Sequence, residues 1–165
     1  MKQLILIRHA KSSWDHKVSD EDRPLQERGT KDAHLVGSHL YLHLKGSQID
    51  FAYSSPAIRA LHTAMIVVRE TEHPLDRFGL NASLYDFSGE KVSKFVGQLD
   101  DDLETVALFG HNNAFTSLAN AWGDRYIENL PTAGVVHIVF QEERWSNISR
   151  GSIKKLLLPK QLRNK

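Results

Sequence analysis

The chain has 165 residues, of which 41% are hydrophobic, and its 21 basic and 20 acidic residues leave a formal charge of +1. This length fits one globular domain over residues 1–165, and so balanced a charge does not supply the dense basic surface that nucleic-acid binding usually needs. Because the chain contains no cysteine, disulfides, zinc sites with thiolate ligands and a cysteine-dependent phosphatase mechanism are excluded.

The apolar stretch at the start of the chain covers only Leu4 to Ile7 before Arg8 interrupts it. It is shorter than the core of a signal peptide and far shorter than a membrane span. The lack of cysteine also fits a reducing compartment. We therefore expect a cytoplasmic protein that does not enter membranes.

The first predicted element is a strand over residues 2–8, because a short apolar run bounded by polar residues is typical of a strand buried on both faces. A polar loop follows from residue 11 to about residue 24. Apolar side chains after Thr30 then recur at three- and four-residue spacing, which predicts a first helix. Residues 49–54 form a second predicted strand, and Pro56 suits the first turn of the helix behind it.

The second half of the chain continues this alternation. Residues 104–109 are predicted to form a third strand, and residues 112–122 to form a helix with its apolar side chains on one side. Residues 135–140 and 152–158 are expected to pair as two further strands at a sheet edge. Strands that alternate with helices predict an α/β fold, with a mainly parallel central sheet and helices on both faces.

Two arginines and two histidines stand at the ends of these predicted elements. Arg8 and His9 follow the first strand, Arg59 lies at the start of the second helix, and His111 follows the third strand. Ligand sites in open α/β sheets lie at the carboxyl ends of the strands, so we expect these side chains to meet. Arginine stays charged and can hold two phosphate oxygens, while helix N-termini add N–H donors. The pattern predicts a pocket for a phosphoryl group.

The two histidines need different protonation states in such a pocket. A histidine that attacks phosphorus must be neutral at the attacking nitrogen, whereas one that stabilises the phosphoryl oxygens is better as an imidazolium. Because phosphoryl transfer mainly needs positioning and charge stabilisation, this set can act without a metal. No group of acidic and histidine residues has convincing metal-ligand spacing, so we expect neither a metal nor a cofactor.

Four other residues near these positions are candidates for substrate contact. Lys11 and Ser12 follow the first strand, where they either donate hydrogen bonds to phosphate or are merely solvated. Asn112 is expected to contribute through its backbone N–H. Trp14 could stack on a substrate, but a loop aromatic more often packs over the edge of the core.

Several motifs together resemble the histidine phosphatase superfamily. They are Arg8-His9-Ala10, Ser55-Pro56 with Arg59-Ala60, Gly110-His111-Asn112 and Leu130-Pro131-Thr132-Ala133. The Arg23-Pro24-Leu25 segment and the short chain are similar to the branch of SixA-like phosphohistidine phosphatases, and the likeness runs from Leu4 to about Pro159. This resemblance implies a phosphoglycerate mutase-like fold without a large cap domain. It also implies that His9 is the nucleophile that forms a phosphohistidine intermediate, and that Arg8, Arg59 and His111 bind the phosphoryl group.

The identity of a general acid stays open at this point. Larger members of the superfamily place a glutamate in a Leu-x-Glu context, and Leu84-Tyr85-Asp86 is the nearest equivalent here, which makes Asp86 a candidate. Compact SixA-like proteins can lack this acid. A phosphoramidate substrate would tolerate its absence, because protonated imidazole is already a good leaving group.

We therefore expect a phosphatase that removes the phosphoryl group from phosphohistidine on a protein, since short segments between the catalytic elements leave the pocket open to a bulky partner. One alternative is a phosphatase for a small phosphoester metabolite, which would need Asp86 as a working acid. Another is a phosphate-binding module without turnover, in which a neutral nucleophile at His9 has no evident use. The partner is accordingly a phosphorylated protein or a small phosphorylated molecule, and the sequence does not indicate an oligomeric state.

Overall fold

The computed structural model describes residues 1–164 and contains a six-stranded sheet with the order β3-β2-β4-β1-β5-β6. Strands β1 to β4 are parallel, and β5 runs antiparallel to both of its neighbours. The predicted mainly parallel sheet and the predicted pairing of the last two strands are confirmed. The strands are β1 (Lys2–Arg8), β2 (Phe51–Ser54), β3 (Phe78–Leu80), β4 (Thr105–Gly110), β5 (Val135–Phe140) and β6 (Ser152–Leu157).

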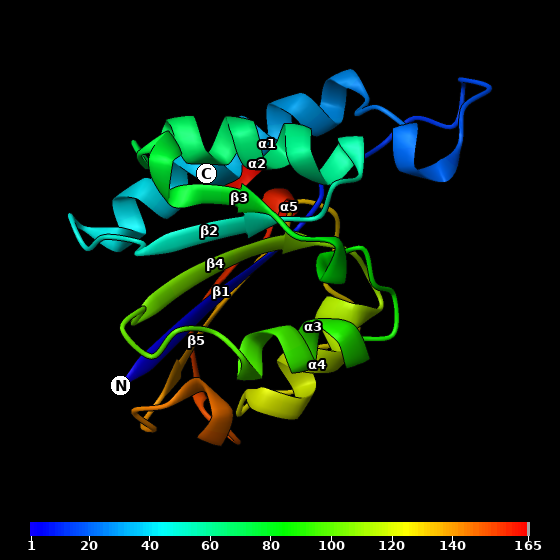
Figure 1. Ribbon diagram of the computed structural model, residues 1–165. Helices are drawn as coiled ribbons and strands as arrows, with labels where there is room; N and C mark the ends of the chain where they lie inside the picture. Colours follow the sequence, from blue (N-terminus) through cyan, green and yellow to red (C-terminus); the bar gives the residue numbers. More distant parts are fainter. Residues whose placement is uncertain (165) are drawn as a thin grey trace.

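Helices cover both faces of this sheet, as the alternating pattern predicted (Figure 1). One face carries α1 (Glu27–Leu44), α2 (Ile58–Glu70) and the short α5 (Pro159–Arg163). The other face carries α3 (Glu90–Gly97) and α4 (Ala114–Trp122). Among the described helices, none combines the length and the apolar character needed to cross a membrane. Short 3-10 turns lie at Asp20–Asp22, Leu75–Arg77, Ala82–Leu84 and Trp145–Asn147.

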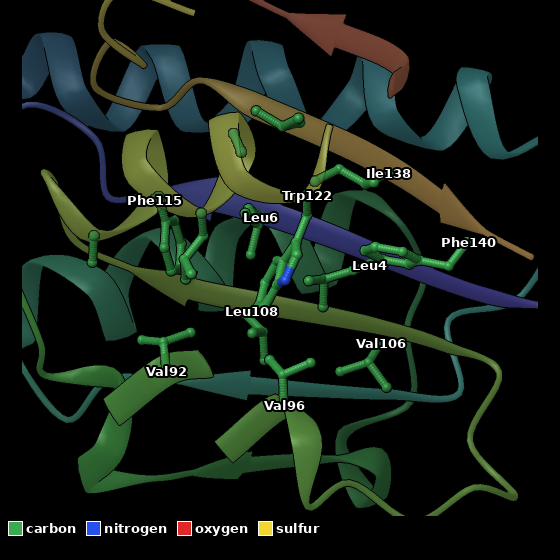
Figure 2. Packing of buried hydrophobic residues seen from close by; sticks show 14 of the residues in the cluster. Leu4, Leu6, Val92, Val96, Val106, Leu108, Phe115, Trp122, Ile138 and Phe140 are labelled. Atoms are coloured by element: carbon green, nitrogen blue, oxygen red, sulfur yellow. The ribbon is translucent and has the colours of Figure 1, made fainter. Parts of the chain in front are cut away.

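The central strand β1 contributes to the core on both sides of the sheet. Leu4 and Leu6 pack in the cluster formed with α3 and α4, whereas Ile5 and Ile7 pack in the cluster formed with α1 and α2. Successive side chains of a strand point to opposite faces, so a strand covered on both faces needs an uninterrupted apolar run. Figure 2 shows the first of these clusters, in which side chains from β1 and β4 pack with Trp122 and its neighbours on α4.

The structure also contains short elements that the sequence analysis did not predict. Strand β3 has three residues at the sheet edge and α3 has eight, which is too few to display a clear apolar period. Helix α1 begins at Glu27, ahead of the predicted start near Thr30, because the Thr30 N–H already donates to the Gln26 carbonyl at 3.1 Å. Gly29 in this first turn lies against the loop that follows β1.

The strands place the functional residues at one edge of the sheet. Arg8, the last residue of β1, pairs in register with Gly110, the last residue of β4. The His9 N–H then donates to the Gly110 carbonyl at 3.0 Å, and the Ser55 N–H donates to the Phe109 carbonyl at 2.9 Å. Backbone pairing therefore continues just beyond the strands and fixes the positions from which the side chains project.

Candidate active site

A pocket of about 460 Å³ opens at the carboxyl edge of the parallel strands. Seven of the candidate residues named in the sequence analysis line it. They are Arg8, His9, Lys11, Ser12, Trp14, Arg59 and Asn112.

The side chain of His9 is oriented by its own backbone neighbour. Its Nδ1 atom lies 2.7 Å from the Ala10 carbonyl oxygen. Because a carbonyl only accepts hydrogen bonds, Nδ1 carries the proton and Nε2 keeps its lone pair. Burial, together with the charges of Arg59 and Arg8, lowers the pKa of His9 to about 3. His9 is therefore a neutral imidazole at pH 7, which is the form that can attack phosphorus.

His111 lies fully buried beside His9, with the two ring centroids 5.3 Å apart. Its Nε2 atom is 2.8 Å from the Ser55 hydroxyl oxygen, and its Nδ1 atom is buried without a hydrogen-bond partner. Burial, followed by the charges of His9 and Arg59, lowers the pKa of His111 to about 3. The free protein thus holds His111 neutral rather than as the expected imidazolium, and a phosphate dianion beside it would raise this pKa.

Each arginine of the site keeps one buried donor unpaired. Arg8 donates from Nη1 to the Leu130 carbonyl at 2.8 Å, and Arg59 donates from both terminal nitrogens to Asp20, at 2.6 Å and 3.0 Å. The Nε atoms of both arginines have no partner.

These unpaired atoms decide what the pocket can hold. Across residues 1–164, the buried side-chain polar atoms without a hydrogen-bond partner are Arg8 Nε, Arg59 Nε and His111 Nδ1. An unpaired buried polar group costs about 1–3 kcal/mol, so such atoms are few in native proteins. All three belong to residues assigned to phosphoryl binding, and an anion in the pocket would give them partners.

Residues 4–80 match the model of the histidine phosphatase superfamily (branch 1). This part of the chain is therefore similar to members of that superfamily. The matched segment contains β1, α1, β2 and α2, and with them three of the four predicted phosphoryl-site residues, Arg8, His9 and Arg59.

Known proteins resemble this chain over almost its whole length. An uncharacterized protein of Mycobacterium tuberculosis is 27% identical over 161 residues, which cover 88% of this chain and 93% of the relative. The solved structure of the protein histidine phosphatase SixA complexed with tungstate has a TM-score of 0.79 at 20% identity, and covers 97% of this chain and 99% of its own. A mycobacterial glucosyl-3-phosphoglycerate phosphatase has a TM-score of 0.68 at 12% identity, with coverages of 94% and 98%. Both structures show the same fold.

Asp20 is a site residue that the sequence analysis missed. Its carboxylate accepts hydrogen bonds from the Tyr85 hydroxyl at 2.6 Å, from Arg59 at 3.0 Å and from Arg23 at 3.2 Å. Desolvation raises the pKa of Asp20, but these hydrogen bonds and the charge of Arg59 outweigh it and lower the pKa to about 2. Arg59, whose place at the start of α2 was part of the evidence for an anionic ligand, is therefore already paired with the carboxylate of Asp20. Asp20 lies in a polar loop without periodic pattern, so only its contacts reveal it.

Asp86 has a different role from the general acid considered above. Its carboxylate accepts hydrogen bonds from the backbone N–H groups of Gly89, Lys91 and Val92, at 3.0 to 3.1 Å, and from Ser88. Desolvation raises its pKa, but these donors outweigh it and leave the pKa below the usual value. An ionised carboxylate that caps α3 has no proton to donate at neutral pH, so the structure argues against Asp86 as the acid.

The remaining predicted contacts fall into two kinds. Ser12 Oγ accepts a hydrogen bond from Arg23 Nη1 at 2.7 Å, and Asn112 Oδ1 accepts from the N–H and hydroxyl of Thr116, so both side chains support the site's framework. Lys11 lines the pocket wall. Direct contact of Lys11, or of the Asn112 backbone, with substrate stays a prediction.

Proposed function

We propose that this protein is a phosphatase that transfers the phosphoryl group of its substrate to His9 Nε2 and then to water, and that this substrate is phosphohistidine on a protein. The observation that carries the proposal is the set of unpaired buried nitrogens beside a neutral His9, namely Arg8 Nε, Arg59 Nε and His111 Nδ1. Each can contact an oxygen of a phosphoryl group, and the arginines supply positive charge.

In the first step, the lone pair of His9 Nε2 forms a bond to phosphorus while the bond from phosphorus to the leaving group breaks, and the leaving group keeps that electron pair. Arg8, Arg59 and His111 stabilise the charge on the phosphoryl oxygens throughout. In the second step, a water oxygen attacks phosphorus and the bond to Nε2 breaks. This restores the His9 lone pair and releases inorganic phosphate.

Two features favour phosphohistidine as the substrate over an alkyl phosphoester. Asp86 is occupied as a helix cap, so the segment expected to supply a general acid supplies none. Imidazole that leaves in its protonated form needs no such acid, whereas an alkoxide does. Residues 81–104, between β3 and β4, hold only a 3-10 turn and the eight-residue α3, which leaves the pocket without a large cover and accessible to a protein.

The test is phosphate release from a phosphohistidine-bearing carrier protein and from an aryl phosphate. Wild type is compared with His9→Ala, and with His62→Ala as a control, since His62 is an exposed histidine on α2. We expect release to require His9 and to be unchanged by the control, with a phosphoryl adduct on His9 detectable by mass spectrometry after rapid quenching.

Each result of this comparison has a distinct meaning. Release that persists in His9→Ala would refute the mechanism. A wild-type preference for the ester over the carrier would replace the proposed substrate with a small phosphoester. A folded wild type that binds phosphate but releases none from either compound would identify a binding module.

A further inference from the structure

Phe87 is an aromatic side chain left half exposed at the mouth of the pocket. It is 46% exposed although it lines the site, and its ring centroid lies 5.1 Å from that of His111 and 5.4 Å from that of Tyr85. Full burial of a phenylalanine contributes roughly 1.5–3 kcal/mol, much of which is forgone here. The exposed part of the ring is available to a ligand in the pocket.

Trp14 is a second exposed aromatic residue in the wall of the same pocket. Its side chain is 76% exposed, so it does not pack over the edge of the core as loop aromatics commonly do. The Arg23 guanidinium lies 3.5 Å from the centre of its ring. Arg23 is itself buried and donates hydrogen bonds to Ser12 and Asp20. The Trp14 ring is therefore held in place on one side by a fixed arginine while most of its surface faces solvent.

The direction of the reaction brings the leaving group toward these two rings. In phosphoryl transfer the attacking atom and the leaving atom lie roughly in line on opposite sides of phosphorus. Among the residues that line the pocket, His9 is nearly buried, with 7% of its surface exposed, whereas Phe87 and Trp14 are 46% and 76% exposed. A leaving group opposite His9 points away from the buried nucleophile and toward solvent, which is where exposed lining residues such as these two can contact it.

We propose that Phe87 and Trp14 form a cradle for the planar aromatic ring to which the phosphoryl group is bound, and so determine leaving-group specificity. This inference rests on the proposed function and deepens it, because the imidazole of phosphohistidine is such a ring. Aromatic rings attract one another in offset or edge-to-face arrangements at the separations seen among Phe87, Tyr85 and His111. The free phosphorylated ring and the same ring on a protein share this chemistry.

The kinetic test compares substrates that differ in the ring but keep the type of bond. Phosphoimidazole and phosphoramidate both break a P–N bond, and an aryl phosphate and acetyl phosphate both release an activated oxygen. The variants are Phe87→Ala and Trp14→Ala, with Tyr126→Ala as control, because Tyr126 is an 82% exposed aromatic residue outside the pocket lining. From the strength of aromatic pairs, we expect Phe87→Ala to lower kcat/KM roughly three- to tenfold for the ring substrates, mainly through KM, and less than about twofold for the ringless ones.

A binding measurement separates this inference from the proposed function. Phenylphosphonate and methylphosphonate are not hydrolysed, and calorimetry should show wild type binding the phenyl compound roughly three- to tenfold more tightly, a preference that Phe87→Ala removes. If wild type prefers the phenyl compound in this way but releases no phosphate from any substrate, the proposed phosphatase function is refuted and the cradle is supported. If wild type releases phosphate and neither Phe87→Ala nor Trp14→Ala changes kcat/KM, the cradle is refuted while the phosphatase function stands.

Two further outcomes also decide the matter. An equal loss on ring and ringless substrates would overturn the cradle, since it would mean that Phe87 only positions His111. A loss for the phosphohistidine carrier protein that matches the loss for free phosphoimidazole would support it and place the protein-borne ring in the same cradle. Both variants replace exposed side chains, so we expect them to fold, and circular dichroism is the check.

Discussion

Replacing Asp86 tests whether this carboxylate caps a helix or donates a proton. In Asp86→Ala, the backbone N–H groups of Gly89, Lys91 and Val92 lose an acceptor that each now reaches within 3.1 Å. The N-cap residue of α3 is Gly89, and Asp86 supplies from upstream the side-chain acceptor that this glycine lacks. Loss of a side-chain acceptor at a helix N-terminus costs about 0.5–2 kcal/mol, and hydrogen bonds to a charged group lie at the upper end of the usual range. We expect a loss of about 2–3 kcal/mol in the free energy of unfolding, which thermal denaturation followed by circular dichroism measures.

In a domain of this size the loss corresponds to a fall in Tm of roughly 4–12 °C. Asp86→Asn keeps a side-chain acceptor of nearly equal capping strength, so its cost should stay below about 1 kcal/mol. The folded pKa of Asp86 is lowered, so its charge stabilises the fold above the ordinary value of 3.8, and this contribution is lost as the pH falls through and below that value. The difference in the free energy of unfolding between wild type and Asp86→Ala should therefore become smaller at acid pH.

The catalytic side of the experiment uses the asparagine variant, because it preserves the cap and the position of the neighbouring Phe87. We expect Asp86→Asn to hydrolyse the phosphohistidine carrier and an aryl phosphate within about twofold of wild type, since general acid catalysis would contribute about 10²–10⁴-fold. An Asp86→Asn variant with the Tm of wild type but a hundredfold slower ester hydrolysis would refute this reasoning and make Asp86 the acid.

Three other predictions concern charge, protonation and close packing. Arg59→Met should lower kcat/KM about 10²–10³-fold in steady-state assays, whereas Arg69→Met, at an exposed position of the same helix, should not. Burial lowers the pKa of His137 to about 4, so neutral His137 stabilises the fold above pH 6.5 and this contribution is lost as the pH falls from 6.5 toward 4. Urea titrations should show that the free energy of unfolding has lost about 2 kcal/mol of this contribution at pH 5. The free energy of unfolding of His137→Gln should depend less on acid pH. Gly29→Ala would place Cβ near a backbone oxygen of the loop after β1 and cost about 1–3 kcal/mol in thermal denaturation, whereas Gly97→Ala, with open space around it, should not.

The outcomes that would contradict these three predictions are equally specific. Wild-type kinetics in Arg59→Met would remove that arginine from the phosphoryl site. Acid sensitivity unchanged by His137→Gln would mean that other groups cause it. A Gly29→Ala protein with the Tm of wild type would show that the loop against α1 can move to accommodate the added Cβ without loss of stability.

The residues at strand ends could be predicted because the strands themselves carry a clear pattern. The apolar run before Arg8 and the one before His111 each indicate a buried parallel strand, and such strands end at one edge. Asp20 and Phe87 could not be found in this way, because they lie in loops whose position depends on tertiary contacts. Asp86 was assigned by likeness to larger relatives. The Ser-Gly-Glu that follows it, just before the apolar residues of α3, was an available sign of a helix start.

The backbone of His9 is tied on two sides, since its N–H donates to Gly110 and its carbonyl accepts from Ala133, both at 3.0 Å. The nucleophile thus shares the rigidity of the sheet's centre, whereas the residues that would meet the rest of a substrate lie on connecting segments. Such segments tolerate sequence change far better than a buried strand does. A lineage built on this scaffold can acquire a new substrate by altering its loops while the reacting atom stays where it is.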